Sequence, residues 1–212
     1  MQPNPLYRID ADEVRELIGR APWMQLVSHG PRGLIASSSP VLPDPDATGD
    51  DIVLVTHLGR ADARLHGLVD GQGPTPGPHE MLVIVQGEHG YISPSWYVGE
   101  ERVPVPTWNF EMATLTCDVE VLSHDENMLV LRDLVAHFER AYAGDEGLAL
   151  DPDDEWARGF ALGTTGLRLR VRSFDAKAKM SQNKSAETRA SVVERLGASH
   201  PRLAARMRAT GS

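Results

Sequence analysis

The chain has 212 residues, of which 41% are hydrophobic, and carries a formal net charge of −9. This length and composition suit a packed core, in one sizeable domain or one domain with a helical appendage. The acidic balance argues against a protein that coats nucleic acid or an anionic membrane, because both would repel it. The charge is uneven, however, because eleven basic and three acidic residues lie between Arg168 and Arg208.

The single cysteine and the start of the chain indicate the compartment. Cys117 cannot form an internal disulfide, and the N-terminal residues lack the basic start and apolar core of a signal peptide. No apolar run approaches the length of a membrane span. We therefore expect a soluble, cytoplasmic protein without a membrane partner.

Periodicity predicts a mixture of strands and helices along the chain. Apolar residues alternate where a strand is expected and recur at helical spacing between capping residues where a helix is expected. In chain order, the pattern predicts a helix from Asp10, a β-hairpin at 23–39 with its turn at 29–33, a strand at 52–57, a helix at 61–69, strands at 81–87 and 109–121, helices from Ser123 and Asp151, a strand at 166–174 and a helix from Ser185.

The junction between the strand at 52–57 and the following helix has the composition of an anion site. A strand that passes through Gly59 into a helix leaves backbone N–H groups at the junction, and Thr56, His57 and Arg60 lie beside them as donors. This arrangement favours a phosphate. An ordinary strand-to-helix turn with a surface arginine is the alternative that the same residues allow.

The stretch from Tyr91 to Phe110 has an unusual concentration of rings. It holds two tryptophans and two tyrosines beside prolines and small polar side chains. Such groups provide flat apolar area with polar handles, which a planar polar ligand or a subunit interface requires. A rigid, proline-rich connection that closes one end of a core would explain the composition equally well.

Residue patterns of known catalytic and metal sites are missing. The histidines show no metal-ligand spacing, and the serine-hydrolase and phosphate-loop patterns do not occur. Cys117 falls in the middle of an alternating strand, where it is most simply a core residue. We therefore predict no catalytic residue and no metal site, and expect the function to come from a bound cofactor or a partner.

Three motifs carry a resemblance to a known family. The segments YISPSWY (91–97), VPTWNF (105–110) and KMSQNKSAETRASVVERL (179–196) resemble the PaiB-type family, described as FMN-binding negative transcriptional regulators. The likeness in order and spacing extends from about Tyr7 to Leu196. It implies an α+β fold that is mainly β, a flavin-type split β-barrel with peripheral helices and a C-terminal helix, related to the pyridoxamine-phosphate oxidases.

The resemblance also implies an organisation and a cofactor site. We expect a single FMN-binding domain at 1–197 with a helical insertion at about 123–162, a basic and weakly helical or frayed tail at 198–212, and a homodimer with FMN at the subunit interface. The residues that the resemblance assigns to the cofactor, first around the ring and phosphate and then at the dimer interface and its closing segment, are Ser37, Ser38, Thr56, His57, Arg60, Trp96, Tyr97, Trp108, Asn109, Lys179, Ser181, Gln182 and Asn183.

The chain departs from the family pattern close to this site. Many members have a Ser-His-Leu-Pro run where this chain has Ser37 to Pro40, and an Ala-Arg-Ala-Asn run where it has Gly59 to Asp62. A carboxylate beside a phosphate repels it, so Asp62 predicts weaker FMN binding or an altered or empty site.

Three functions are consistent with these observations. The first is a dimeric FMN-binding transcriptional regulator, in which any DNA contact would use the basic Arg168–Arg208 region, since no helix-turn-helix pattern is visible. The second is a flavin-dependent oxidoreductase of the pyridoxamine-phosphate-oxidase-like class, because FMN itself carries the redox chemistry. The third is a cofactor-free dimer that acts through protein contacts.

Overall fold

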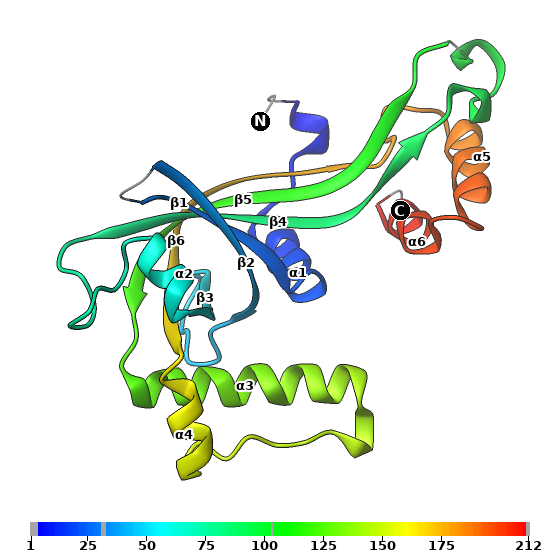
Figure 1. The fold of residues 1–212 in the computed structure, drawn as a ribbon. Helices are drawn as coiled ribbons and strands as arrows, with labels where there is room; N and C mark the ends of the chain where they lie inside the picture. Colours follow the sequence, from blue (N-terminus) through cyan, green and yellow to red (C-terminus); the bar gives the residue numbers. More distant parts are fainter. Residues whose placement is uncertain (1–3, 31–32, 103, 211–212) are drawn as a thin grey trace. The chain divides into compact units, whose positions relative to one another are not determined.

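The computed structural model describes residues 4–30, 33–102 and 104–210, and contains strands, α-helices and short 3-10 helices (Figure 1). The strands are β1 Trp23–Gly30, β2 Gly33–Pro43, β3 Val53–Gly59, β4 His79–Ile92, β5 Thr107–Val121 and β6 Thr164–Lys179. The helices are α1 Ala11–Arg20, α2 Arg60–Leu65, α3 His124–Tyr142, α4 Glu155–Ala161, α5 Ala186–Leu196 and α6 Pro201–Ala209, with 3-10 turns η1 Pro5–Tyr7, η2 Pro94–Trp96, η3 Gly99–Glu101 and η4 Gly144–Glu146.

The strands form a closed barrel in the order β1-β2-β3-β6-β5-β4. Strands β1 and β2 are antiparallel with Leu26 opposite Ser37, as the alternating sequence predicts for a hairpin, although positions 31 and 32 of its expected turn lie outside the described residues. Strand β3 pairs with β2 on one side and with β6 on the other, both antiparallel. The predicted α+β fold, mainly β with peripheral helices, is confirmed.

Contacts divide the chain into two compact units, each built from separated segments. The barrel unit comprises residues 21–85 and 114–174, and the terminal unit comprises residues 1–20, 86–113 and 175–212. Strands β4, β5 and β6 each contribute residues to both units. The expected single domain at 1–197 stays a prediction, and each unit is described below by itself.

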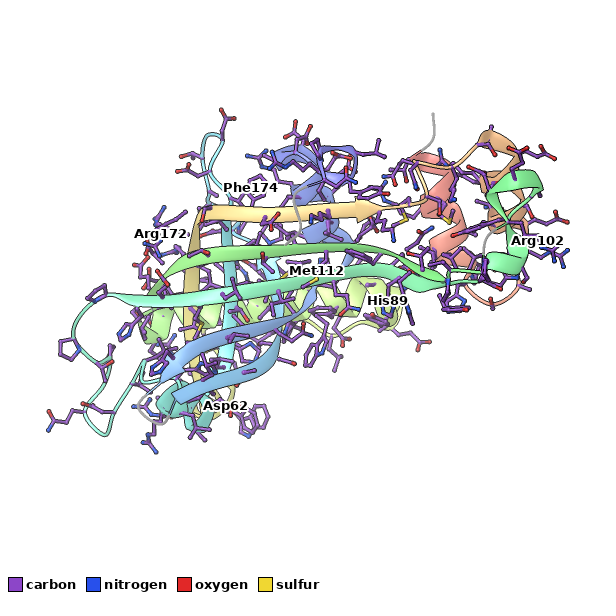
Figure 2. All side chains as sticks on the ribbon, turned by 90° about the horizontal axis from the view of Figure 1, so that it is seen from above. Asp62, His89, Arg102, Met112, Arg172 and Phe174 are labelled. Atoms are coloured by element: carbon purple, nitrogen blue, oxygen red, sulfur yellow. The ribbon has the colours of Figure 1, made fainter. Side chains whose placement is uncertain are left out.

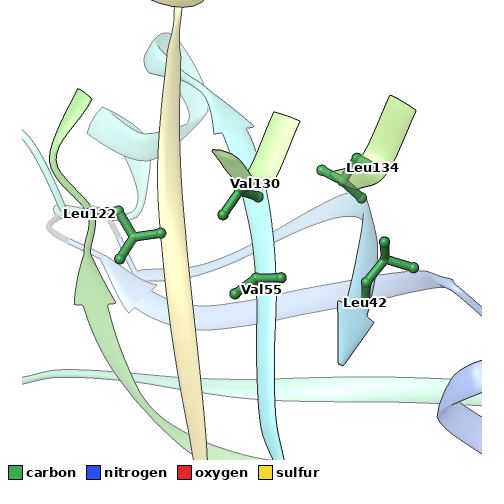
Figure 3. Packing of buried hydrophobic residues seen from close by; sticks show 5 residues of the cluster. All are labelled: Leu42, Val55, Leu122, Val130 and Leu134. Carbon is green, nitrogen blue, oxygen red and sulfur yellow. The ribbon is translucent and has the colours of Figure 1, made fainter. Parts of the chain in front are cut away.

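Helix α3 covers one face of the barrel unit. Ser123 and Glu126 form the predicted capping box at its start. Its inner side packs on β2, β3 and the end of β5 through an apolar cluster, shown in Figure 3, that consists of Leu42, Val55, Leu122, Val130 and Leu134. Together with η4 and α4, α3 occupies 124–161, where the sequence predicts a helical insertion. Val55 faces α3, so strand alternation directs the side chain of His57 toward the same face.

The terminal unit is closed by helices at both ends of the chain. Asp10 and Glu13 cap α1 reciprocally through backbone and side-chain hydrogen bonds, as the sequence predicts. The segment expected to be a basic and weakly helical or frayed tail forms α6 from Pro201, with Leu203 and Met207 fully buried. The helical alternative therefore describes 201–209, where the short apolar stripe of α6 gains its packing from distant residues such as Gly90 on β4.

A buried carboxylate joins three elements of the terminal unit. Glu111 on β5 has no exposed surface, and its oxygens accept hydrogen bonds from Arg20 of α1 at 3.2 Å and from Arg206 of α6 at 2.5 Å. Burial raises the pKa of Glu111, but the hydrogen bonds and charges of the two arginines outweigh it and hold the pKa below its ordinary value. The carboxylate is therefore ionised at neutral pH and fixes both helices.

Two further observations concern the chain as a whole. No helix in the described ranges is long and apolar enough to cross a membrane. Cys117 is fully buried in β5, and burial raises the pKa of its thiol to about 12, which makes it unreactive at neutral pH.

Candidate functional site

The residues that the sequence assigns to the cofactor fall into two groups, one in each unit. The barrel unit holds Ser37, Ser38, Thr56, His57 and Arg60. The terminal unit holds Trp96, Tyr97, Trp108, Asn109, Lys179, Ser181, Gln182 and Asn183.

Ser37 and Ser38 lie on opposite faces of β2. The Ser37 hydroxyl lies 3.0 Å from Nε2 of His66, whose Nδ1 lies 2.7 Å from the Ser28 hydroxyl. His66 is buried, and this burial lowers the pKa of its ring even though Asp62 acts to raise it. Ser38 is exposed on the other face. Only Ser38 can therefore present its side chain to a ligand on the outer face of the hairpin.

Thr56 is engaged within the barrel. It is fully buried, and its hydroxyl donates to the carbonyl oxygen of Pro40 at 2.6 Å. The neighbouring Ser39 hydroxyl donates to the carbonyl oxygen of His57 at 2.6 Å. These bonds hold the end of β3 beside β2, and the side chain of Thr56 has no exposed surface to offer a phosphate.

His57 and Arg60 remain available at the end of β3. The Nδ1 atom of His57 is buried and has no hydrogen-bond partner within the described part of the chain. Burial lowers the pKa of the ring, which is therefore neutral at neutral pH. Arg60 begins α2, and its backbone N–H donates to the carbonyl oxygen of Gly163 at 2.8 Å. The expectation of a free amide at this junction was thus wrong for Arg60, because Gly163, the residue before β6, accepts its hydrogen bond. Among the described residues, the Arg60 guanidinium has no ion-pair partner.

Arg60 lines a pocket of about 230 Å³ within the barrel unit. The other polar walls of the pocket come from the first turn of α3 and the start of β6. The lining residues that bear on its chemistry are Arg60, Ser123, His124, Asn127, Thr164 and Gly166.

Asn127 is the most informative residue of this pocket. It is 2% exposed, and its Nδ2 donates to the Thr164 hydroxyl at 2.9 Å, while its Oδ1 has no hydrogen-bond partner among the residues that the structure describes. A Cβ atom on Gly166 would lie 2.7 Å from Oδ1, so only glycine leaves the amide its present position. A buried acceptor without a donor is costly and fits a site that a ligand hydroxyl completes.

In the terminal unit, Asn109 and Ser181 form a buried pair. The Nδ2 atom of Asn109 lies 3.0 Å from the Ser181 hydroxyl, which lies 3.2 Å from Oδ1. Ser181 has a φ of 60°, a left-handed conformation that serine adopts only under constraint. The Gln182 side chain donates to the carbonyl oxygen of Ala178 and accepts from the Met180 N–H, which holds this turn in place.

The remaining residues of this group differ in accessibility. Lys179 is half-buried and hydrogen-bonded to Thr107, and burial lowers the pKa of its amine. Tyr97 is buried beneath Lys184, whose Nζ lies 4.6 Å from the ring centroid. Trp108 is 54% exposed and adjoins Tyr91 and His89, the latter labelled in Figure 2. Asn183 is exposed.

Much of the aromatic stretch has a structural role. The Trp96 carbonyl oxygen accepts from the Ser191 hydroxyl at 2.8 Å, and the Glu101 carboxylate accepts from the Ser185 hydroxyl that caps α5. The rigid-connection interpretation therefore accounts for residues 93–101. The exposed rings of Tyr91 and Trp108 keep the surface role that a ligand or a subunit would need.

Sequence reasoning missed His66 and Asn127. Asn127 stands on the same helical stripe as Val130 and Leu134, so a polar residue on an apolar stripe was an available signal. His66 stood in a segment expected to be helical to Val69, but α2 ends at Leu65 and His66 turns inward between two strands. Within the described ranges, no group of three or more His, Cys, Asp or Glu residues could hold a metal ion.

Comparison with known proteins identifies the family. The family described as "Putative FMN-binding domain" matches residues 1–173 of the chain. The chain belongs to this PaiB-type, FMN-binding family. The matched part ends within β6, so the segment with Lys179 and Ser181 lies outside it.

A sequence relative agrees with this membership. The chain is 30% identical over 118 residues to "Protease synthase and sporulation protein PAI 2" of Bacillus subtilis, an alignment that covers 55% of each protein. The chain thus spans about half the length of this curated relative.

Solved structures agree with the fold. The FAD and heme binding protein of Mycobacterium smegmatis has a TM-score of 0.59 at 14% identity, covering 87% of this chain and 78% of the other. The flavocytochrome Anf3 of Azotobacter vinelandii has a TM-score of 0.55 at 15% identity, covering 82% and 69%. At these identities the likeness concerns the fold alone, and the flavin cofactor of this chain follows from its FMN-binding family.

Proposed function

We propose that this chain binds FMN as a homodimer and acts as a negative transcriptional regulator. The observation that carries the proposal is an exposed, largely apolar face on β2, β1 and β4 of the barrel unit. In the register of these strands, Ser38, Gln25 and Ile84 form one row across this face, and Ala36, Val27 and Leu82 form the next. Trp23 and Leu34, at 61% and 81% exposed, extend the face at its two ends.

This face supports the homodimer and a cofactor site at its interface, and the regulatory role rests on the resemblance of the chain to the PaiB-type family. A contiguous apolar sheet face in contact with water is typical of an interaction surface, and a second copy would cover it with the same residues by two-fold symmetry. Ser38 would then contact the flavin ring at the interface. The hydrogen bond from Ser39 to His57 holds the end of β3 beside β2, next to Ser38. Arg60 follows directly after β3, so its charge would bind the phosphate of the same FMN molecule.

FMN would supply the electron-transfer chemistry, and this chain would bind and orient the cofactor. Asp62 lies exposed on α2, two residues after Arg60 (Figure 2). Its negative charge partly offsets the attraction of the Arg60 charge for a phosphate, which favours moderate rather than tight FMN binding.

The spectrum of the purified protein, before and after FMN is added, tests the cofactor, and light scattering tests the dimer. We expect a flavin spectrum and the mass of two chains. A monomer without flavin at saturating FMN would contradict the proposal. Rapid reduction of the bound flavin by NADPH or NADH, followed by turnover with an acceptor, would favour the oxidoreductase instead.

A contact with DNA would depend on a small part of the basic region. Arg168 pairs with Asp44 at 2.8 Å, and Arg172 pairs with Glu80 and Asp118. In α6, Arg202 pairs with Glu88 at 2.8 Å and Arg206 with Glu111. These cations are offset by nearby carboxylates. The charge free for phosphate contacts therefore lies on exposed residues such as Arg195 and Arg208.

Binding to promoter DNA at several salt concentrations tests the regulatory role. We expect affinity that falls with salt, and a smaller salt dependence for the Arg195→Ala, Arg208→Ala double variant. Arg172→Ala is the matched control, because its charge is already paired. If the chain does not bind DNA at low salt, with or without FMN, it does not regulate transcription by contacting DNA directly.

A further inference from the structure

We propose that the pocket at the start of α3 binds the ribityl phosphate of FMN, with Asn127 accepting a hydrogen bond from a ribityl hydroxyl. This inference rests on the proposed function and assigns binding residues, Asn127 and the first turn of α3, that lie outside the motifs of the sequence. All of its residues belong to the barrel unit.

The hydrogen bonds around Asn127 determine what the ligand must provide. The Thr164 hydroxyl donates its proton to the carbonyl oxygen of Ala161 at 2.8 Å. It can therefore only accept from Asn127, which fixes Nδ2 toward Thr164 and Oδ1 away from it. Because no described residue donates to Oδ1, the group that completes this site must carry an O–H or N–H.

The charges around the pocket determine the other end of the ligand. The guanidinium of Arg60 is available, and the start of the 19-residue helix α3 contributes partial positive charge. The carboxylates of that first turn do not oppose it, since Asp125 pairs with Arg158 at 2.5 Å and Glu126 caps Ser123. An anionic group is therefore favoured beside a hydroxyl donor, and a polyol phosphate has both.

The size of the pocket indicates a part of FMN rather than the whole molecule. Sites for complete drug-sized ligands have volumes of about 300–1,000 Å³, and this pocket has about 230 Å³. The ribityl phosphate would enter the pocket while the ring stays outside it. His124, half-buried at the first position of α3, lines the same pocket and is placed to contact the ligand.

Three flavins that differ only in their side chain separate the contributions. FMN carries the ribityl chain and the phosphate, riboflavin lacks the phosphate, and lumiflavin lacks both. Each is titrated by fluorescence into the wild type and into the Asn127→Leu, Arg60→Gln and Arg64→Gln variants. Arg64 is exposed on α2 and does not line the pocket, so its variant is the matched control.

We expect Asn127→Leu to weaken FMN and riboflavin by about tenfold each and to leave lumiflavin unchanged. Arg60→Gln should weaken FMN by about tenfold to a hundredfold and leave riboflavin unchanged. If flavins bind the wild type and both variants bind them equally well, the assignment of this pocket is wrong.

A second measurement uses the wild-type chain alone, in case Asn127→Leu does not fold. Ribitol 5-phosphate should bind by calorimetry and displace FMN, and inorganic phosphate should do so only more weakly. If ribitol 5-phosphate binds although no flavin does, the pocket assignment stands and the proposed cofactor is wrong. If FMN binds and ribitol 5-phosphate neither binds nor competes, the pocket assignment is wrong.

Discussion

At the scale of single residues, the backbone of Ser181 stores strain beside the predicted cofactor residues. A φ of 60° costs serine more than glycine, and the surrounding hydrogen bonds hold it there. Ser181→Gly and Ser181→Ala both lose the bond to Asn109, but only glycine accepts this φ. We expect the alanine variant to be less stable than the glycine variant by about 1 kcal/mol in urea unfolding. Equal stabilities would mean that the backbone is not strained.

Glu111 offers a second test at this scale. Glu111→Gln leaves Arg20 and Arg206 facing a neutral amide in a buried site, so we expect a loss of about 3–5 kcal/mol in the free energy of unfolding. Glu120 lies on the same strand with half of its side chain exposed. Its Glu120→Gln variant is the control and should lose no more than about 1 kcal/mol. Similar losses in the two variants would contradict the buried triad.

The pH dependence of stability follows from the lowered pKa values. His57 and His66 have pKa values below the ordinary 6.5, so the stability from their neutral rings is present above pH 6.5 and is lost as the pH falls through the folded values. Glu111 has a pKa below its ordinary 4.5, so its contribution persists to lower pH and is lost below 4.5. Urea midpoints between pH 8 and 3 should fall in two stages. His57→Gln should make the fall in the urea midpoint smaller in the first stage, where the histidines are protonated, and leave the second stage unchanged.

At the scale of elements, α6 is part of the folded core rather than a charged extension. Arg206 is mostly buried against Glu111, whereas Arg208, two residues later, is exposed. We expect Arg206→Ala to be strongly destabilising and Arg208→Ala to change the free energy of unfolding by no more than about 0.5 kcal/mol. Thermal unfolding of the two variants gives the comparison. An unaffected Arg206→Ala variant would mean that α6 is not anchored by this pair.

Local sequence signals predict most of the elements because their causes are local. The capping boxes at Asp10 and Ser123 depend on residues three positions apart, and the alternation of β5 and β6 appears in any short window. Helix α6 was underestimated because its stripe is short and its partner, Gly90, lies far away in the chain. Helix α2 was extended too far because burial of His66 by two strands overrides the helical spacing.

The candidate site was less predictable than the elements for a similar reason. Motif resemblance selected Arg60 and Ser38, but it also selected Thr56, whose hydroxyl the barrel uses internally. Asn127 could not be recognised from the sequence, since its unsatisfied oxygen results from Thr164 and Gly166 on another element. Unpaired atoms of this kind depend on tertiary contacts.

At the scale of the whole molecule, the exposed face of β2, β1 and β4 predicts the assembly. Trp23→Lys combined with Ala36→Lys places charges on this face at two exposed positions. We expect monomers in light scattering and weaker FMN binding, because desolvated charge opposes association. Trp156→Lys, at another exposed tryptophan, on α4, is the control and should leave the dimer intact. If the double variant is still a dimer, the interface lies on another surface.

The division of the terminal unit among three separate segments has a consequence for synthesis and for dissection of the protein. This unit draws on residues 1–20, 86–113 and 175–212, so its packing cannot be complete until α6 has left the ribosome. In a nascent chain, α1 would lack its partners Gly87 and Glu111 until residues 86–113 have been made, and any single cut in the middle of the chain would divide both units. Pairings between such distant segments also slow folding, because long loops must close first.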